Sequence, residues 1–146
     1  MAQPGQPGLT FNVIGRIGPA VRRRLARIVA QTALAVEGDA RGAMAEAKHG
    51  RSYRRRGGRL HVASAPGEAP AIDTGALAGS VQAGEAGPLA WEVAVGAEYG
   101  AILEFGSEHI EPRPFLGPAV EAQREAFEAA CAAAVGAGAR DAGARP

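Results

Sequence analysis

The sequence predicts an α+β fold: a small antiparallel β-sheet packed by two long helices, about residues 19–48 and 116–135, with short helices and a long basic loop. Apolar residues recur at three- and four-residue spacing in both long segments. Residues 81–95 instead contain alternating apolar and polar residues on either side of a turn. The length of 146 residues fits a single domain.

The N-terminal part is expected to contain an arm, a short strand and the first long helix. Four Pro and Gly residues make 1–10 a flexible arm, and 10–14 alternate weakly, as a short strand does. A Gly-Pro pair at 18–19 suits a helix entrance, because Pro is tolerated in the first turn. Gly38 and Gly42 each weaken the helix by about 1 kcal/mol relative to Ala, which favours a kink or fraying there.

The middle of the chain, residues 49–71, has the least regular pattern. The run Arg51–Arg59 holds five arginines, one tyrosine and two glycines, and Leu60–Ser64 fits a short strand. A loop of this length in a small domain is usually functional or mobile. Beyond it, Asp73 or Thr74 is expected to cap a short helix, because their side-chain oxygens can accept a free amide of the first turn.

The C-terminal part alternates short elements with the second long helix. Residues 81–95 are expected to form an antiparallel pair with its turn at 85–88. Tyr99–Phe105 fits one or two helical turns, with Gly106 in the left-handed terminal position. Pro112 and Pro114 stiffen the connection to the helix at 116–135. Residues 136–146, rich in Gly and Ala, are expected to be a frayed tail, which leaves 11–135 as the domain.

The composition predicts a small core of slim side chains. Hydrophobic residues make up 47% of the chain but aromatic residues only 5%, and alanine supplies much of the former. A domain with so little bulky apolar material can complete its burial by oligomerisation. The residues expected to pack the helices on the sheet are Leu77, Trp91, Tyr99, Phe105 and Phe115.

The net charge of +1 hides a strong asymmetry. Residues 1–66 carry twelve Lys or Arg and three acids, a balance of +9, whereas residues 67–135 carry two Arg and eleven acids, a balance of −9. The basic part of one copy could therefore meet the acidic part of another. Two solvated faces that offset each other explain the same counts, and both interpretations stay open.

Residue inventory argues against catalysis, metals and cofactors. The single cysteine, Cys131, lies on the apolar stripe of the last helix, and the three histidines have no ligand spacing. No phosphate-cradling or dinucleotide-binding glycine motif occurs, and no Gly-x-Ser-x-Gly. We therefore expect no catalytic residue, cofactor or metal. No membrane partner is expected either, because no stretch of about 18 apolar residues occurs.

Two local features leave functional alternatives. Arg51, Arg54, Arg55, Arg56 and Arg59 beside Tyr53 form a candidate contact for nucleic acid or for a protein neighbour, since Arg binds phosphates and Tyr stacks on bases. A solvated basic loop is the plain alternative. Glu104 lies between apolar neighbours, so it needs an Arg or backbone amides as partner. A hydrolase using Glu104 and His109 is a remote third possibility.

Three motifs occur in order: Ile72-Asp73-Thr74-Gly75-Ala76-Leu77-Ala78-Gly79-Ser80, then Tyr99-Gly100-Ala101-Ile102-Leu103-Glu104-Phe105-Gly106-Ser107, then Pro114-Phe115-Leu116-Gly117-Pro118-Ala119. Together they resemble the small neck or tail-completion proteins of long-tailed phages, the gene-product-10-like family of HK97-type phages. The resemblance spans about residues 12–135, and its three motifs come after the basic loop. Gly100 and Ser107 stand where Ala and Thr are usual. The motif residues that carry it, and that we expect to be structural, are Asp73, Thr74, Gly75, Leu77, Ser80, Tyr99, Glu104, Phe105, Gly106, Pro114, Phe115 and Pro118.

This resemblance implies a structural virion protein of a phage, prophage or gene-transfer particle. Such a protein would be an α+β subunit without enzymatic activity that joins head and tail as part of a homo-oligomeric ring, for which a hexamer is the expected form. Its partners would be the neighbouring head-closure or adaptor and tail-tube proteins, with non-specific contact to packaged DNA. Its place would be the head–tail junction of the virion, and the host cytoplasm during assembly.

Overall fold

The computed structural model describes the backbone of residues 18–143 and the side chains of residues 18–140. It confirms the predicted α+β fold class. The expected arm at 1–10 and the expected strand at 10–14 lie outside the described residues.

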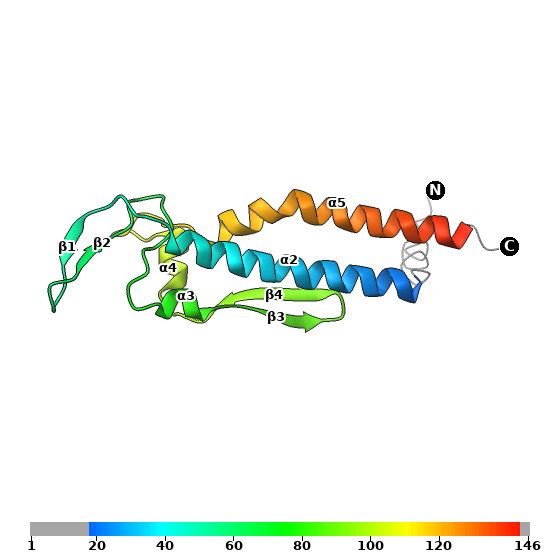
Figure 1. Ribbon diagram of the computed structural model, residues 1–146, viewed down its shortest axis with the longest axis horizontal. Coiled ribbons are helices and arrows are strands. Elements are labelled where there is room, and N and C mark those ends of the chain that lie inside the picture. Colours follow the sequence, from blue (N-terminus) through cyan, green and yellow to red (C-terminus); the bar gives the residue numbers. More distant parts are fainter. Residues whose placement is uncertain (1–17, 144–146) are drawn as a thin grey trace, which may run out of the picture.

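The body is elongated and built in three layers (Figure 1). The long helix α2 (Pro19–Ala45) lies in the middle, with α5 (Leu116–Gly143) on one side and a β-ribbon on the other. The ribbon consists of β3 (Val81–Gly87) and β4 (Ala90–Val95). Helix α2 therefore contacts both outer layers and is the centre of the fold.

The short elements lie toward one end of this body. They are the hairpin strands β1 (Ser52–Arg54) and β2 (Leu60–Val62) and the helices α3 (Ala76–Ser80) and α4 (Gly100–Phe105). The β1–β2 hairpin projects beyond the layers, away from the end where α2 begins (Figure 1). In the described residues the strands form two separate two-stranded sheets, rather than a single one. Strand β1 in particular was not anticipated.

Helix α2 begins as the sequence predicts. Gly18 is extended, with φ −60° and ψ 156°, and Pro19 is the first helical residue. The helix continues through Gly38 and Gly42 as one element and ends at Ala45, three residues before the expected end. The kink or fraying expected at these two glycines therefore does not interrupt the helix.

Helix α5 begins at Leu116 as predicted but ends at Gly143, eight residues later than the expected end at 135. Its C-terminal part lies close to the start of α2, where a Cβ at Gly138 would collide with the side chain of Val21. Packing against α2 therefore supports a segment whose glycines alone predict fraying. Among the described helices, none is long and apolar enough to cross a membrane.

The ribbon confirms the predicted antiparallel pair. Val81 lies opposite Val95 and Glu85 opposite Trp91, with an irregularity between Glu85 and Gly87. The turn, however, is formed by the two residues between Gly87 and Ala90, so the expected turn at 85–88 is wrong. Its second residue, Leu89, has a φ of 61°, a position that Gly or Asn normally takes. A leucine there carries no sequence signal for a turn.

The core lies where α2, α3, β3 and the start of α5 meet. Its buried members are Val36, Ala40, Met44, Leu77, Val81, Phe115 and Ala119. Leu77 and Phe115 are thus confirmed as core residues, whereas Trp91 is half-buried. The expectation is wrong for Tyr99 and Phe105, which are 47% and 80% exposed. The sequence shows that both residues are aromatic and lie in a short helical segment, but not that this helix turns them away from the core.

Candidate functional site

Glu104 joins α4 to the first turn of α5. Its Oε2 accepts hydrogen bonds from the backbone amides of Phe115 and Leu116 at 2.9 and 3.0 Å, and its Oε1 accepts one from Gly117 at 2.8 Å. A carboxylate at a helix N-terminus satisfies amides that have no partner within the helix, and it interacts favourably with the helix dipole. The predicted need of Glu104 for backbone amides is confirmed.

The Asp73–Ser80 motif forms a turn that leads into α3. The hydroxyl of Thr74 accepts the amide of Ala76 at 3.3 Å, and Gly75 has a φ of 81°, which suits glycine. The hydroxyl of Ser80 donates to the carbonyl of Leu77 at 2.8 Å. The capping position of α3 is Gly75, so the expectation that Asp73 or Thr74 occupies it is wrong, and only Thr74 contacts an amide of the helix.

Asp73 instead forms an ion pair with Arg55 of the basic hairpin. This contact ties the turn between β1 and β2 back to the body of the molecule. Arg55 is half-buried, whereas Arg51, Arg54, Arg56 and Arg59 are exposed. The five arginines that the sequence grouped together thus divide into one that is tied to the body and four that are exposed, of which Arg54 donates to the carbonyl of Gly58 at 3.1 Å.

The basic hairpin has a defined backbone rather than the irregular loop that the sequence predicts. The amide of Arg55 donates to the carbonyl of Arg59 at 3.0 Å, and the amide of Gly58 donates back to that of Arg55 at 2.9 Å. Tyr53 and His61 face each other across the strands, with ring centroids 5.3 Å apart in an edge-to-face arrangement. Tyr53 remains 43% exposed. The hairpin thus presents arginines and one aromatic ring.

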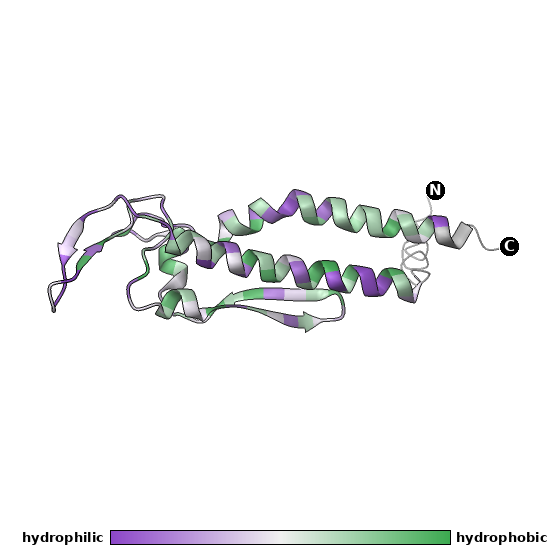
Figure 2. Ribbon diagram, viewed as in Figure 1, coloured by the Kyte–Doolittle hydropathy of each residue, from purple (hydrophilic) through white to green (hydrophobic). Residues whose placement is uncertain are grey.

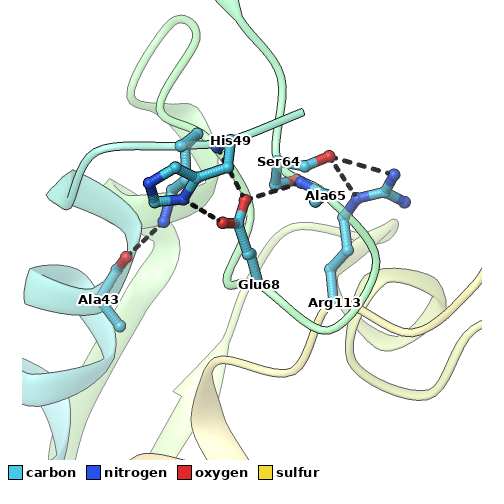
Figure 3. Close-up of polar contacts among 7 residues, drawn as sticks. Ala43, His49, Ser64, Ala65, Glu68 and Arg113 are labelled. Carbon is cyan, nitrogen blue, oxygen red and sulfur yellow. Dashed lines mark hydrogen bonds and ion pairs between the residues drawn. The ribbon is translucent and has the colours of Figure 1, made fainter. Parts of the chain in front are cut away.

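Glu68 fixes the base of the hairpin (Figure 3). Its Oε2 accepts the amides of Ala65 at 2.7 Å and His49 at 3.2 Å, and its Oε1 lies 2.6 Å from Nδ1 of His49. These contacts lower the pKa of the Glu68 carboxyl from 4.5 to about 2, first through the Ala65 amide and then through His49. The carboxylate form of Glu68 therefore holds together the two chain segments at the base of the hairpin, at His49 and Ala65.

Arg113 binds the hairpin base from the other side (Figure 3). Its Nε and one of its terminal nitrogens lie 3.4 Å from the carbonyl oxygen of the buried Ser64. The amide of Gly67 donates to the carbonyl of Pro112 at 3.0 Å. Sequence reasoning missed this anchoring, because contacts between positions 49 residues apart leave no local pattern.

A second polar anchor holds the β-ribbon on α2. Glu37 accepts the amide of Ala83 at 2.7 Å, and Arg41 donates to the carbonyls of Ala78 at 3.0 Å and Val81 at 2.6 Å. Glu37 and Arg41 also form an ion pair at 2.6 Å, one helical turn apart. Neither residue was singled out from the sequence.

The two remaining proline positions of the motif border a cleft between α2 and α5. Pro114 is half-buried and Pro118 exposed, and both line this cleft beside Phe115. At the end of α4, Gly106 has φ 76° and ψ −176°, so it does not take the expected left-handed helical conformation but another region that is essentially restricted to glycine. A Cβ there would lie 2.7 Å from the carbonyl oxygen of Ile110, so this position requires glycine.

One face of α4 is apolar and unusually exposed. Tyr99, Ile102 and Phe105 follow one another at three-residue spacing and are 47%, 45% and 80% exposed. Phenylalanine is among the residues most often buried, so an exposed one on a regular helix indicates an interaction surface. This face of α4 lies outside the core and is exposed.

The basic residues occupy two opposite ends of the molecule. Hydrophilic residues gather on the hairpin and near the start of α2 (Figure 2). At that start, Arg22, Arg23, Arg24 and Arg27 are all exposed. Between the two ends, α5 presents the exposed acids Glu121, Glu125 and Glu128. The basic half of the sequence is therefore two separate patches and not one pole.

The two residues named for the hydrolase alternative, Glu104 and His109, already contact other groups of the protein. Both carboxylate oxygens of Glu104 accept backbone amides, and His109 lies 3.3 Å from Glu108 in an exposed ion pair. Among the residues that the structure describes, no group of three His, Cys, Asp or Glu side chains could hold a metal ion. Cys131 is half-buried on α5.

No family model, curated protein or solved structure matches this chain.

Proposed function

We propose that this chain is a non-enzymatic building block of a phage, prophage or gene-transfer particle, a subunit of the ring that joins head and tail. The observation that carries the proposal is the α4 face. An 80% exposed Phe105 on a helix held by hydrogen bonds is unfavourable for an isolated subunit and becomes favourable once a neighbour covers it.

The motif resemblance gains support from the roles that its residues have in the fold. Thr74 and Gly75 shape the turn before α3, Glu104 caps α5, and Gly106 ends α4 at a positive φ. These roles are architectural. Scaffold roles for these motif residues suit a structural protein.

The mass of the assembly tests this proposal. Light scattering should give a multiple of 14.8 kDa, and electron microscopy should show closed rings. Co-purification with head-closure and tail-tube proteins encoded beside it would place the ring in a particle. A chain that stays monomeric alone and with such partners would contradict the proposal.

A second candidate function is non-specific nucleic-acid binding through the hairpin. The four exposed arginines and the exposed Tyr53 on a projecting hairpin favour it. Replacing Arg51, Arg54, Arg56 and Arg59 by Ala should reduce the slope of log affinity against log salt concentration by up to about 4. Arg55 is kept, because its ion pair with Asp73 is structural.

The matched control removes four arginines from the other end of the molecule. Alanine at Arg22, Arg23, Arg24 and Arg27 changes the net charge equally but leaves the hairpin intact. Hairpin-mediated binding predicts a smaller effect for this control in a filter-binding or anisotropy titration of duplex DNA. Absence of salt-dependent binding by the unmodified protein would eliminate this candidate.

A further inference from the structure

We propose that Phe105 of one copy inserts into an apolar groove between α2, β4 and α5 of a second copy. The inference rests on the proposed assembly function and deepens it, because it names the two surfaces that meet. The surfaces differ, so the contact is head-to-tail, and repetition of a head-to-tail contact generates a ring or a filament.

The inserted element is held in place before binding. The carbonyl of Leu103 in α4 accepts the amide of Arg113 at 2.7 Å, and the amide of Gly106 closes the helix on the carbonyl of Ile102 at 2.8 Å. Glu104 further bonds α4 to the first turn of α5. The backbone that carries Phe105 therefore has little conformational freedom left to lose on binding, which favours affinity.

The receiving groove is apolar and large enough for an aromatic ring. Its floor contains Val29 and Val36 of α2, and its walls contain Trp91 of β4 with Val120 and Phe127 of α5. Its volume is about 270 Å³. For comparison, an apolar cavity of about 150 Å³ lined by aliphatic and aromatic side chains binds benzene.

One end of the groove, at the start of α2, is basic and complements the acids beside α4, whereas the α5 wall carries mixed charges, Glu121 and Glu128 with Arg124. Residues 98–111, which contain α4, carry the exposed acids Glu98, Glu108 and Glu111 and no Lys or Arg. The start of α2 carries four exposed arginines, of which Arg22 lies seven residues before Val29 and hence two turns along the same helix face. A second copy of this chain therefore supplies both the apolar side chain that inserts, Phe105, and an acidic rim around it, formed by Glu98, Glu108 and Glu111.

The two surfaces are separated within one molecule. Helix α4 lies toward the end that carries the hairpin, whereas the arginines at the start of α2 lie at the opposite end (Figure 1). The acidic rim of one copy therefore meets the basic end of another copy rather than its own. This arrangement favours contact between copies over self-closure.

Cross-linking between two cysteine variants tests the contact. In a Cys131→Ala background, Ala101→Cys places a thiol one turn from Phe105 on the same face of α4, and Thr32→Cys places one in the groove. A short bismaleimide should link the two variants when they are mixed and should link neither variant alone. Val135→Cys, exposed on α5, replaces Ala101→Cys as the control and should give no link to Thr32→Cys.

A serine substitution tests the role of the aromatic ring itself. Phe105→Ser should lower the yield of the mixed cross-link at least tenfold and leave the monomer folded, because the side chain is 80% exposed. Leu60→Ser, which removes a 61% exposed apolar side chain from the hairpin, should leave the yield unchanged.

The outcomes separate this inference from the proposed function. Rings seen by electron microscopy without the mixed cross-link would overturn the inference and leave the proposed function standing. The cross-link without any closed ring would support the contact and contradict the ring. A monomer at every soluble concentration, without cross-link, would overturn both. A link between two Ala101→Cys chains would indicate a symmetric contact and would also overturn the inference.

Discussion

Glu104 shows how one side chain can determine where a helix begins. Its two oxygens accept three backbone amides of the first turn of α5. Glu104→Gln keeps the size of the side chain but removes the charge and turns one acceptor into a donor. We expect a loss of about 1–2 kcal/mol in the free energy of unfolding.

Urea denaturation measures this loss, and Glu108→Gln is its control. Glu108 is exposed and has only a surface contact with His109, so its substitution should change stability by less than about 0.5 kcal/mol. Equal stability of Glu104→Gln and the unmodified protein would show that the carboxylate does not hold α5.

The lowered pKa of Glu68 predicts how the stability of the protein changes in acid. Its pKa is lowered to about 2 in the folded protein, so the carboxylate stabilises the fold at pH values above about 4.5, the value expected when the chain is unfolded. This contribution decreases as the pH falls from 4.5 toward 2. Glu68→Gln lacks it at every pH.

The stability difference between the unmodified protein and Glu68→Gln should therefore be constant above about pH 5 and diminish below pH 4.5. Denaturation at a series of pH values measures it. An NMR titration of the Glu68 carboxyl gives the pKa directly, and a midpoint near 4.5 would contradict the hydrogen-bonded hairpin base.

At the scale of elements, two glycines of α5 offer a matched pair. Gly138 faces α2, where a Cβ would collide with the side chain of Val21, whereas a Cβ at Gly136 would meet only a terminal nitrogen of Arg140 at 3.8 Å, an ordinary contact. Gly136→Ala should stabilise the protein by up to about 1 kcal/mol through helix propensity. Gly138→Ala should destabilise it instead, because the buried and β-branched Val21 has little freedom to move.

Thermal unfolding of the two variants measures this contrast. Stabilisation by both substitutions would mean that the C-terminal part of α5 does not pack on α2.

The sequence predicts the elements with strong local signals and misses those that depend on distant contacts. Apolar spacing places α2 and α5, and the Gly18-Pro19 pair marks where α2 begins. Strand β1 has no apolar alternation, and the leucine of the β3–β4 turn carries no turn signal. These two elements depend on partners that local sequence patterns do not reveal.

The site residues likewise divide into those that local sequence patterns predict and those that depend on distant contacts. The burial of Glu104 among apolar neighbours implies a polar partner, and the structure provides backbone amides. The expected burial of Tyr99 and Phe105 fails, because an apolar side chain in a short helix can lie on either face and the sequence does not show which face is covered. Glu37 and Arg41 bind backbone groups more than 35 residues away, for which the sequence contains no local cue.

At the scale of the whole molecule, the chain has a small core and a long body. Its buried cluster is confined to the junction of α2, α3, β3 and α5, while apolar side chains of α4 and the hairpin remain exposed. Basic patches lie at both ends, and acids lie between them. Such a distribution favours contacts between unlike surfaces of neighbouring copies.

The molar mass in solution, by light scattering coupled to size exclusion, tests this account most directly. The unmodified chain should elute at a multiple of 14.8 kDa, and the Phe105→Ser variant at 14.8 kDa. A single species of 14.8 kDa for the unmodified chain, alone and with head-closure and tail-tube partners, would contradict it.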